Sequence, residues 1–238
     1  VDNFGTTGES PSHPELLDYL ATQLMEDDWS IKQLVRQIVL SRTYRLASAP
    51  DQTSGRDIEN RLLSRRNLKR VDAETLRDAM LLVSGALDQT MGGKTYPDTL
   101  ASDYQFEFKR PMRSVYVPVF RNSLPEIFEA FDFANPSMVT GRRNSSTVAP
   151  QALFLMNHPF VREQAQRTAE RLLAMSMPTD SDRVRFCYLT LLARPATDEE
   201  VAISETFLAA TAADSTLSEA WTQLVQSLFA SLDFRYVR

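Results

Sequence analysis

The spacing of apolar residues along the chain predicts a mainly α-helical protein. In several stretches apolar residues recur every three or four positions, which places them on one face of a helix. The pattern covers residues 16–25, 34–39, 76–87, 160–173, 184–192, 201–208 and 221–229. Glycine is scarce, at 7 of 238 residues, which argues against a protein built from many tightly turned strands.

Recurring start signals precede these helical stretches. In a capping box, a Ser or Thr side chain accepts a hydrogen bond from a free amide of the first turn, and a Glu or Gln three residues later reaches back. The pattern occurs at Ser12–Glu15, Ser30–Gln33, Ser123–Glu126 and Thr197–Glu200, and Asp72 and Asn157 are further N-cap candidates. We expect Gly92 and Gly93 to end the helix that Asp72 begins.

The period of the pattern changes to two near residues 103–120. Aromatic residues and then valines alternate with other residues, at Tyr104, Phe106 and Phe108, then at Val115, Val117 and Val119. This is strand spacing and predicts a small β-hairpin packed against helices, because a lone hairpin is marginal in water. The predicted fold is therefore mainly α: one helical domain over residues 1–238, with a candidate sub-boundary in the long polar loop 134–150.

Charge and composition limit the function classes. The net charge is −5, whereas a nucleic-acid binder needs a basic footprint, so we expect no nucleic-acid partner. No apolar run approaches the roughly 18–20 residues that cross a bilayer, so we expect no membrane span. The chain begins at Val1 without a start Met or a signal-like segment, and we expect it to be a fragment of a larger protein.

The chain has only one cysteine and two histidines, and from these we predict neither a metal site nor a cofactor. Cys187 is the only cysteine, which excludes an internal disulfide, a C-x-x-C-H haem motif and zinc-type cysteine pairs. The two histidines, His13 and His158, each precede a proline at a predicted helix start. A helix N-terminus disfavours the imidazolium, so we expect each to be neutral and structural. The alternative is a metal held by both histidines and a carboxylate.

Seven separate short segments of the sequence resemble one known family. They are Asn3–Gly5, Ser12–Leu17, Asn60–Leu63, Val71–Ala79, Pro118–Glu126, Thr140–Asn144 and Pro150–Asn157. In this order they resemble the C-terminal domain of unknown function of large secreted planctomycete proteins, which often carry a cytochrome c-type domain upstream. The resemblance covers nearly the whole chain. It implies an extracytoplasmic location, periplasmic or secreted, upstream domains of the same parent chain as partners, and no established activity.

Arginines and amides form the strongest candidate site. Residues 109–123 contain several basic residues and no acidic one, and a second basic pair lies in the polar loop. Arginine forks suit carboxylate, sulfate or phosphate groups. We predict one solvent-reachable ligand-binding site made of Arg113, Arg121, Asn122, Arg142, Arg143 and Asn144. The alternative is that these arginines brace the fold by pairing with acidic residues or helix carbonyls. A further basic run, Arg61, Arg65, Arg66, Lys69 and Arg70, is expected to be a solvated helix face paired with acidic residues. The alternative is that this run, together with Asn60 and Asn67, faces the same pocket.

Aromatic residues of the predicted hairpin admit two interpretations. Tyr104, Phe106 and Tyr116 could form a platform for a sugar ring, or their alternation reflects hairpin packing. Carboxylate pairs for glycoside hydrolysis remain open at this point, because such pairs meet only in the fold.

No catalytic template is complete, so catalytic residues stay unassigned and the existence of an enzymatic activity stays open. The G-x-S-x-G elbow, the phosphate loop and the G-x-G-x-x-G motif are all missing from the sequence. The first hypothesis is a binding module of an exported multidomain protein that recognises an anionic group, for example on a polysaccharide, or a small anion. The second is a hydrolase or lyase acting on acidic glycans, and the third is a structural support domain. A deep pocket that joins Arg142 to a histidine and a carboxylate would favour the enzyme.

Overall fold

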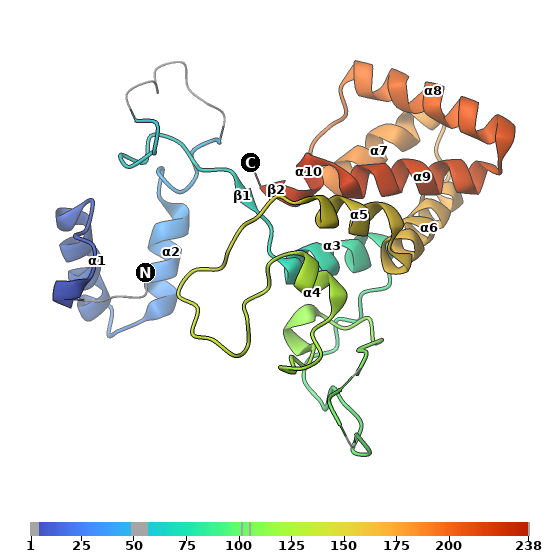
Figure 1. Cartoon of the computed structure of the whole chain (residues 1–238). Helices are drawn as coiled ribbons and strands as arrows, with labels where there is room; N and C mark the ends of the chain where they lie inside the picture. The colour runs from blue at the N-terminus through green and yellow to red at the C-terminus, as the bar shows by residue number, and fades with distance from the viewer. Residues whose placement is uncertain (1–4, 49–56, 101, 105, 238) are drawn as a thin grey trace. The chain divides into compact units, whose positions relative to one another are not determined.

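A computed structural model describes residues 5–48, 57–100, 102–104 and 106–237. The chain divides into two compact units, Val1–Lys69 with Val237–Arg238, and Arg70–Tyr236. The candidate sub-boundary in the loop 134–150 lies inside the second unit (Figure 1).

The first unit contains a pair of helices joined by a short turn. The helical elements are η1 (Gly5–Thr7), α1 (Pro14–Glu26) and α2 (Ile31–Leu40). Ser30 caps α2 as predicted, because its Oγ accepts from the Gln33 amide at 3.4 Å. The capping box predicted at Ser12 is wrong. The N-cap of α1 is His13, which makes no side-chain cap, and Ser12 Oγ lies 3.0 Å from His13 Nδ1.

A buried asparagine organises the segment after α2. Asn60 is 4% exposed and has a φ of +53°, a conformation that Asn adopts more readily than most residues. Its amide nitrogen donates to the Arg65 carbonyl at 2.7 Å and to Asn67 Oδ1 at 3.1 Å, while its own Oδ1 accepts from the Arg65 amide at 3.2 Å. The Arg65 guanidinium in turn donates to the Asp57 carbonyl at 3.2 Å. Arg65 therefore stabilises the turn instead of belonging to a purely solvated helix face.

The second unit is a helical assembly around α9 (Leu217–Ala230). Its other helices are α3 (Ala73–Ser84), η3 (Ser114–Tyr116), α4 (Glu126–Ala130), α5 (Ala149–Asn157), α6 (Pro159–Ala174), α7 (Asp180–Leu192), α8 (Asp198–Asp214) and α10 (Leu232–Arg235). Trp221, Val225 and Phe229 of α9 are fully buried at helical spacing. Helix α9 packs against α6, whose buried Ala165 and Ala169 let the two helices approach closely (Figure 1).

The mainly α fold with a minor β element is confirmed, but the β element lies elsewhere. Strands β1 (Lys69–Arg70) and β2 (Tyr236–Val237) form a two-stranded sheet. Residues 101 and 105 are outside the described part of the chain. In the described part of 103–120, isolated bridges at Met112 and Phe120 and the turn η3 replace the predicted hairpin.

Side chains of α3 hold the segment that was predicted to be a hairpin. Arg77, which is 8% exposed, donates to the Met112 carbonyl at 2.8 Å and to the Arg110 carbonyl at 3.0 Å. Asp78 accepts from the Ser114 amide at 2.8 Å. Backbone groups that a β-ladder requires are thus bonded to side chains, and Pro111 has no amide hydrogen to contribute. Burial lowers the pKa of Arg77, while the Asp78 carboxylate acts in the opposite direction.

The end of α3 differs from the prediction. The helix ends at Ser84 and not at Gly92, because Gly85 takes the left-handed conformation with a φ of +76°. An added Cβ at Gly85 would lie 2.9 Å from the Arg171 guanidinium, which caps the helix by donating to the Val83 carbonyl at 2.5 Å.

Three further start signals have different outcomes. The Thr197–Glu200 capping box is confirmed. The box predicted at Ser123 is wrong, because α4 begins after Pro125 and the Ser123 hydroxyl donates to the Phe106 carbonyl at 2.9 Å. The N-cap predicted at Asn157 is also wrong: α5 ends there, and His158 is the N-cap of α6.

Candidate functional site

A hydrogen-bonded clasp closes the base of the polar loop in the second unit. The Asp132 carboxylate accepts from the Ser146 amide at 2.8 Å and from the Ser146 hydroxyl at 2.9 Å. Arg70, whose side chain is 5% exposed, donates to Asp132 Oδ2 at 2.6 Å and also to the Ser146 carbonyl. Burial tends to raise the pKa of Asp132, but the hydrogen bonds from Ser146 and Arg70 outweigh it and lower the pKa below its ordinary value. The loop therefore begins and ends on a fixed, ionised anchor.

One of the predicted site arginines braces this loop against α3. Arg143 Nη1 donates to Glu74 Oε2 at 2.8 Å, and the guanidinium lies 4.8 Å from the centre of the Phe133 ring. The hydrogen bond that Arg143 donates to Glu74 raises the pKa of Arg143. Arg143 thus has the structural role that the sequence left as the alternative.

Three of the predicted arginines have no such brace. Arg113, Arg121 and Arg142 are exposed, and none of them forms a side-chain hydrogen bond or ion pair with a described residue. Every other arginine of the second unit does. They are Arg70, Arg77, Arg110, Arg143, Arg162, Arg167, Arg171, Arg183, Arg185, Arg194 and Arg235.

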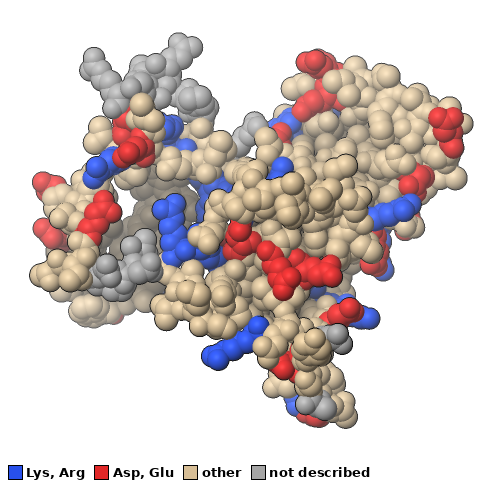
Figure 2. Space-filling view, viewed as in Figure 1, with Lys and Arg blue, Asp and Glu red and all other residues tan. Residues whose placement is uncertain are grey.

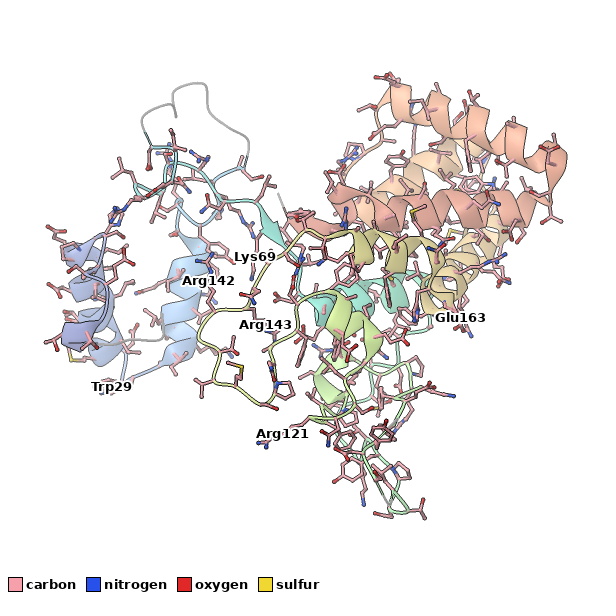
Figure 3. The ribbon with its side chains drawn as sticks, viewed as in Figure 1. Trp29, Lys69, Arg121, Arg142, Arg143 and Glu163 are labelled. Atoms are coloured by element: carbon pink, nitrogen blue, oxygen red, sulfur yellow. The ribbon has the colours of Figure 1, made fainter. Side chains whose placement is uncertain are left out.

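The two predicted asparagines are at the surface. Asn122 donates to Asp103 Oδ2 at 3.4 Å, a long hydrogen bond, and Asn144 is exposed next to the brace. In the view of Figure 3, Arg121, Arg142 and Arg143 lie along one edge of the second unit and come from two segments. Figure 2 shows separate basic patches along this edge instead of one continuous basic face. Convergence of all six residues on one ligand stays a prediction.

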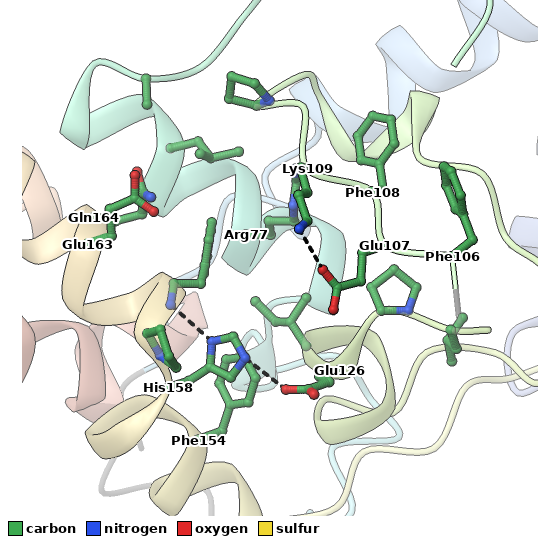
Figure 4. Close-up of a pocket in the computed structure, with 18 of the residues that line it drawn as sticks. Arg77, Phe106, Glu107, Phe108, Lys109, Glu126, Phe154, His158, Glu163 and Gln164 are labelled. Carbon is green, nitrogen blue, oxygen red and sulfur yellow. Dashed lines mark hydrogen bonds and ion pairs between the residues drawn. The ribbon is translucent and has the colours of Figure 1, made fainter. Parts of the chain in front are cut away.

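A cleft of about 1030 Å³ opens elsewhere in the second unit (Figure 4). It lies between α3, the segment 106–111, the start of α4, and helices α5 and α6. Its aromatic lining is Phe106, Phe108, Phe154 and Phe160, and its charged or titratable lining is Arg77, Glu107, Lys109, Glu126, His158, Glu163 and Arg167. None of the six predicted site residues lines this cleft.

A histidine and a glutamate face each other in the cleft. His158 Nε2 lies 2.8 Å from Glu126 Oε2, and the imidazole stacks on Phe154 with ring centres 4.1 Å apart. His158 Nδ1 accepts from the Phe160 amide at 3.2 Å, so the proton of the neutral ring belongs on Nε2 and points at the carboxylate. The pair holds one oxygen of Glu126 in place.

No pattern in the sequence points directly to this pair. Glu126 was assigned to a capping box, but α4 begins at that residue with Pro125 as N-cap, and the Glu126 side chain reaches across to α6 instead. The available signal is that both residues follow or precede a proline at the start of a helix. Side chains at such positions are held by the first turn and can point away from it.

The single thiol of the chain lies in the core. Cys187 is fully buried, and burial raises its pKa to about 12, so the thiol is neutral at physiological pH. In the described ranges no three His, Cys, Asp or Glu side chains gather in a way that would hold a metal ion. Within the same ranges no helix has the length and apolar character needed to cross a membrane.

The comparisons with known proteins define the family. Residues 1–208 match the PSD1 family, described as a protein of unknown function (DUF1553). The match covers most of the chain, so the protein belongs to this family. No curated protein and no solved structure matches it.

Proposed function

We propose that the chain is a ligand-binding module that recognises an anionic group, such as a carboxylate or sulfate of a polysaccharide, through Arg121 and Arg142. The proposal rests on which arginine side chains already have an internal partner and which do not. Among the arginines of the second unit, only Arg113, Arg121 and Arg142 form no side-chain hydrogen bond or ion pair with a described residue. An unpaired guanidinium can bind an anion without first giving up an internal salt bridge.

The loop that carries Arg142 is suited to this role. The Asp132 clasp fixes both of its ends, and the Arg143 brace fixes the residue next to Arg142. A backbone held in this way loses less conformational freedom when a ligand binds than a free loop would. Arg142 is thus presented from an ordered segment.

The rival functions have less support. The cleft contains a histidine and a carboxylate but none of the predicted arginines, so it lacks the combination that would favour an enzyme acting on acidic glycans. A purely structural role would require these arginines to form internal ion pairs or hydrogen bonds, and Arg121 and Arg142 form none with the residues that the structure describes. Following the family resemblance, we also propose that the module works outside the cytoplasm, attached to upstream domains of its parent chain.

Binding of polygalacturonate, with a neutral galactan for comparison, tests the proposal. Arg121→Ala and Arg142→Ala should each weaken binding by about tenfold to a hundredfold, because a hydrogen bond to a charged group contributes roughly 1.5–3 kcal/mol. Arg185→Ala is the matched control, since Arg185 is 48% exposed and already pairs with Asp198. Equal losses in all three variants, or a wild type that binds no anionic polysaccharide, would contradict the proposal.

A further inference from the structure

We propose that the cleft of the second unit is a separate binding site for a neutral saccharide of several rings. Its volume of about 1030 Å³ is at the upper end of the range for small-molecule sites, which is roughly 300–1,000 Å³. An oligosaccharide therefore fits the available space better than a single sugar. The proposal is independent of the arginine site, because the two share no residue.

The charges of the cleft favour a neutral ligand. Its carboxylates, Glu107, Glu126 and Glu163, are matched in number by its permanent cations, Arg77, Lys109 and Arg167. Glu107 pairs with Lys109 at 3.1 Å and Glu163 with Arg167 at 2.9 Å. The permanent charges of the lining therefore cancel, so they offer no field that would select an anion or a cation.

The polar groups of the cleft are arranged to bind hydroxyl groups. Glu126 is 77% exposed, and His158 occupies only its Oε2, which leaves Oε1 as an acceptor. Gln164 lines the cleft and is 3% exposed. Its Oε1 accepts from Ser84 Oγ at 2.8 Å, which leaves Nε2 as a donor without a partner in the described part of the chain. A hydroxyl group both donates and accepts, so it can satisfy an acceptor and a donor of this kind.

The aromatic residues supply the apolar part of the site. Phe106 and Phe108 come from the segment 106–111, and Phe154 comes from α5 across the cleft (Figure 4). Phe160 of α6 also lines the cleft. Phe106 also packs edge-on against Phe120, with ring centres 5.6 Å apart, which holds it in position. The C–H faces of a sugar ring can bury against such rings while its hydroxyls reach the polar groups. Phe106 thus packs against Phe120 and also lines the proposed site, whereas Tyr104 and Tyr116, the other two residues of the platform suggested from the sequence, do not line the cleft.

Calorimetric titration of the full chain with cello-, xylo-, manno- and maltohexaose tests this inference. We expect at least one of these neutral hexasaccharides to bind, and Glu126→Ala to weaken that binding about tenfold or more. Glu129→Ala is the matched control, because Glu129 is exposed on the same short helix but does not line the cleft. It should leave the affinity within about twofold.

Two further variants make the outcome specific. Glu126→Gln keeps the shape of the side chain and an acceptor for His158, so weaker binding by this folded variant supports the site even if Glu126→Ala unfolds. Arg142→Ala should retain hexasaccharide binding while it loses polygalacturonate binding, which separates this inference from the proposed function. The inference is overturned if no neutral hexasaccharide binds, if Glu126→Ala and Glu129→Ala bind equally well, or if peptides of similar length bind as tightly as the hexasaccharides.

Discussion

The Glu74 carboxylate and the Arg143 guanidinium lie 2.8 Å apart although the two residues are 69 positions apart in the sequence. This ion pair joins the polar loop to α3 and gives Arg143 a different role from its neighbour Arg142. Of two adjacent arginines, Arg143 joins the loop to α3, whereas Arg142 forms no side-chain hydrogen bond or ion pair with a described residue. The distinction rests on a contact between distant parts of the chain.

Replacing the two adjacent arginines should therefore affect stability differently. Arg143→Ala should lower the free energy of unfolding by about 1 kcal/mol, because it removes a partly exposed ion pair and a contact with Phe133. Arg142→Ala should change it by less than about 0.5 kcal/mol, as expected for an unpaired surface residue. Urea denaturation of both variants measures this. Equal destabilisation would show that Arg142 also braces the fold.

The clasp at the base of the loop should be more sensitive. Asp132→Asn retains a residue that tolerates the φ of +58° at this position, but it removes the charge that faces buried Arg70. An uncompensated buried cation costs about 3–5 kcal/mol, so we expect strong destabilisation by urea denaturation. Asp198→Asn removes an ion pair whose carboxylate is 94% exposed and should be nearly neutral. A similar result for both variants would mean that the Arg70 pair adds nothing beyond a surface contact.

Acid should destabilise the second unit through Glu200. The hydrogen bonds from Arg194 lower the pKa of Glu200 from 4.5 to about 2. A depressed pKa contributes stability above the unfolded value, and that stability is lost as the pH falls from 4.5 to about 2. Glu200→Gln should make the stability less dependent on pH in this window, as measured by thermal unfolding across it. An unchanged pH dependence would show that other carboxylates control acid unfolding.

The tautomer of His158 follows from its two hydrogen bonds. Because Nδ1 accepts from the Phe160 amide and Nε2 faces Glu126, the neutral ring should carry its proton on Nε2. Side-chain ¹⁵N spectra at about pH 8, where an ordinary histidine is neutral, distinguish the two tautomers. A proton on Nδ1 would be incompatible with the cap on α6 and with the geometry of the His158–Glu126 pair.

Helix positions were predictable, but several boundaries and the β element were not. Local signals place the capping box at Thr197 and the buried face of α9. The end of α3 depends on Gly85 adopting a left-handed conformation beside Arg171, which no local pattern distinguishes from a stop at Gly92. Alternation near residues 103–120 resembles a strand, but Arg77 binds the backbone carbonyls there. The alternation of apolar residues in this segment does not show that a side chain of a distant helix binds its backbone.

The candidate site was predictable only in composition. The sequence identifies an arginine-rich region, because a run without acidic residues is visible directly. It does not separate Arg143 from Arg142, since the partner of Arg143 lies far away in α3. The cleft escaped prediction for the same reason: Glu126 comes from α4, His158 and Gln164 come from the start and first half of α6, and the two helices meet only through packing.

An NMR titration that follows the arginine side-chain Nε–H signals as tetragalacturonate is added tests whether Arg121 and Arg142 bind one anionic ligand. We expect the signals of Arg121 and Arg142 to shift together along one binding curve, while those of Arg143 and Arg185 change little because these two side chains already pair with Glu74 and Asp198. Shifts of Arg121 and Arg142 at clearly different ligand concentrations would show that the two do not share a site. A complete lack of shifts at either residue would contradict the anion-binding function itself.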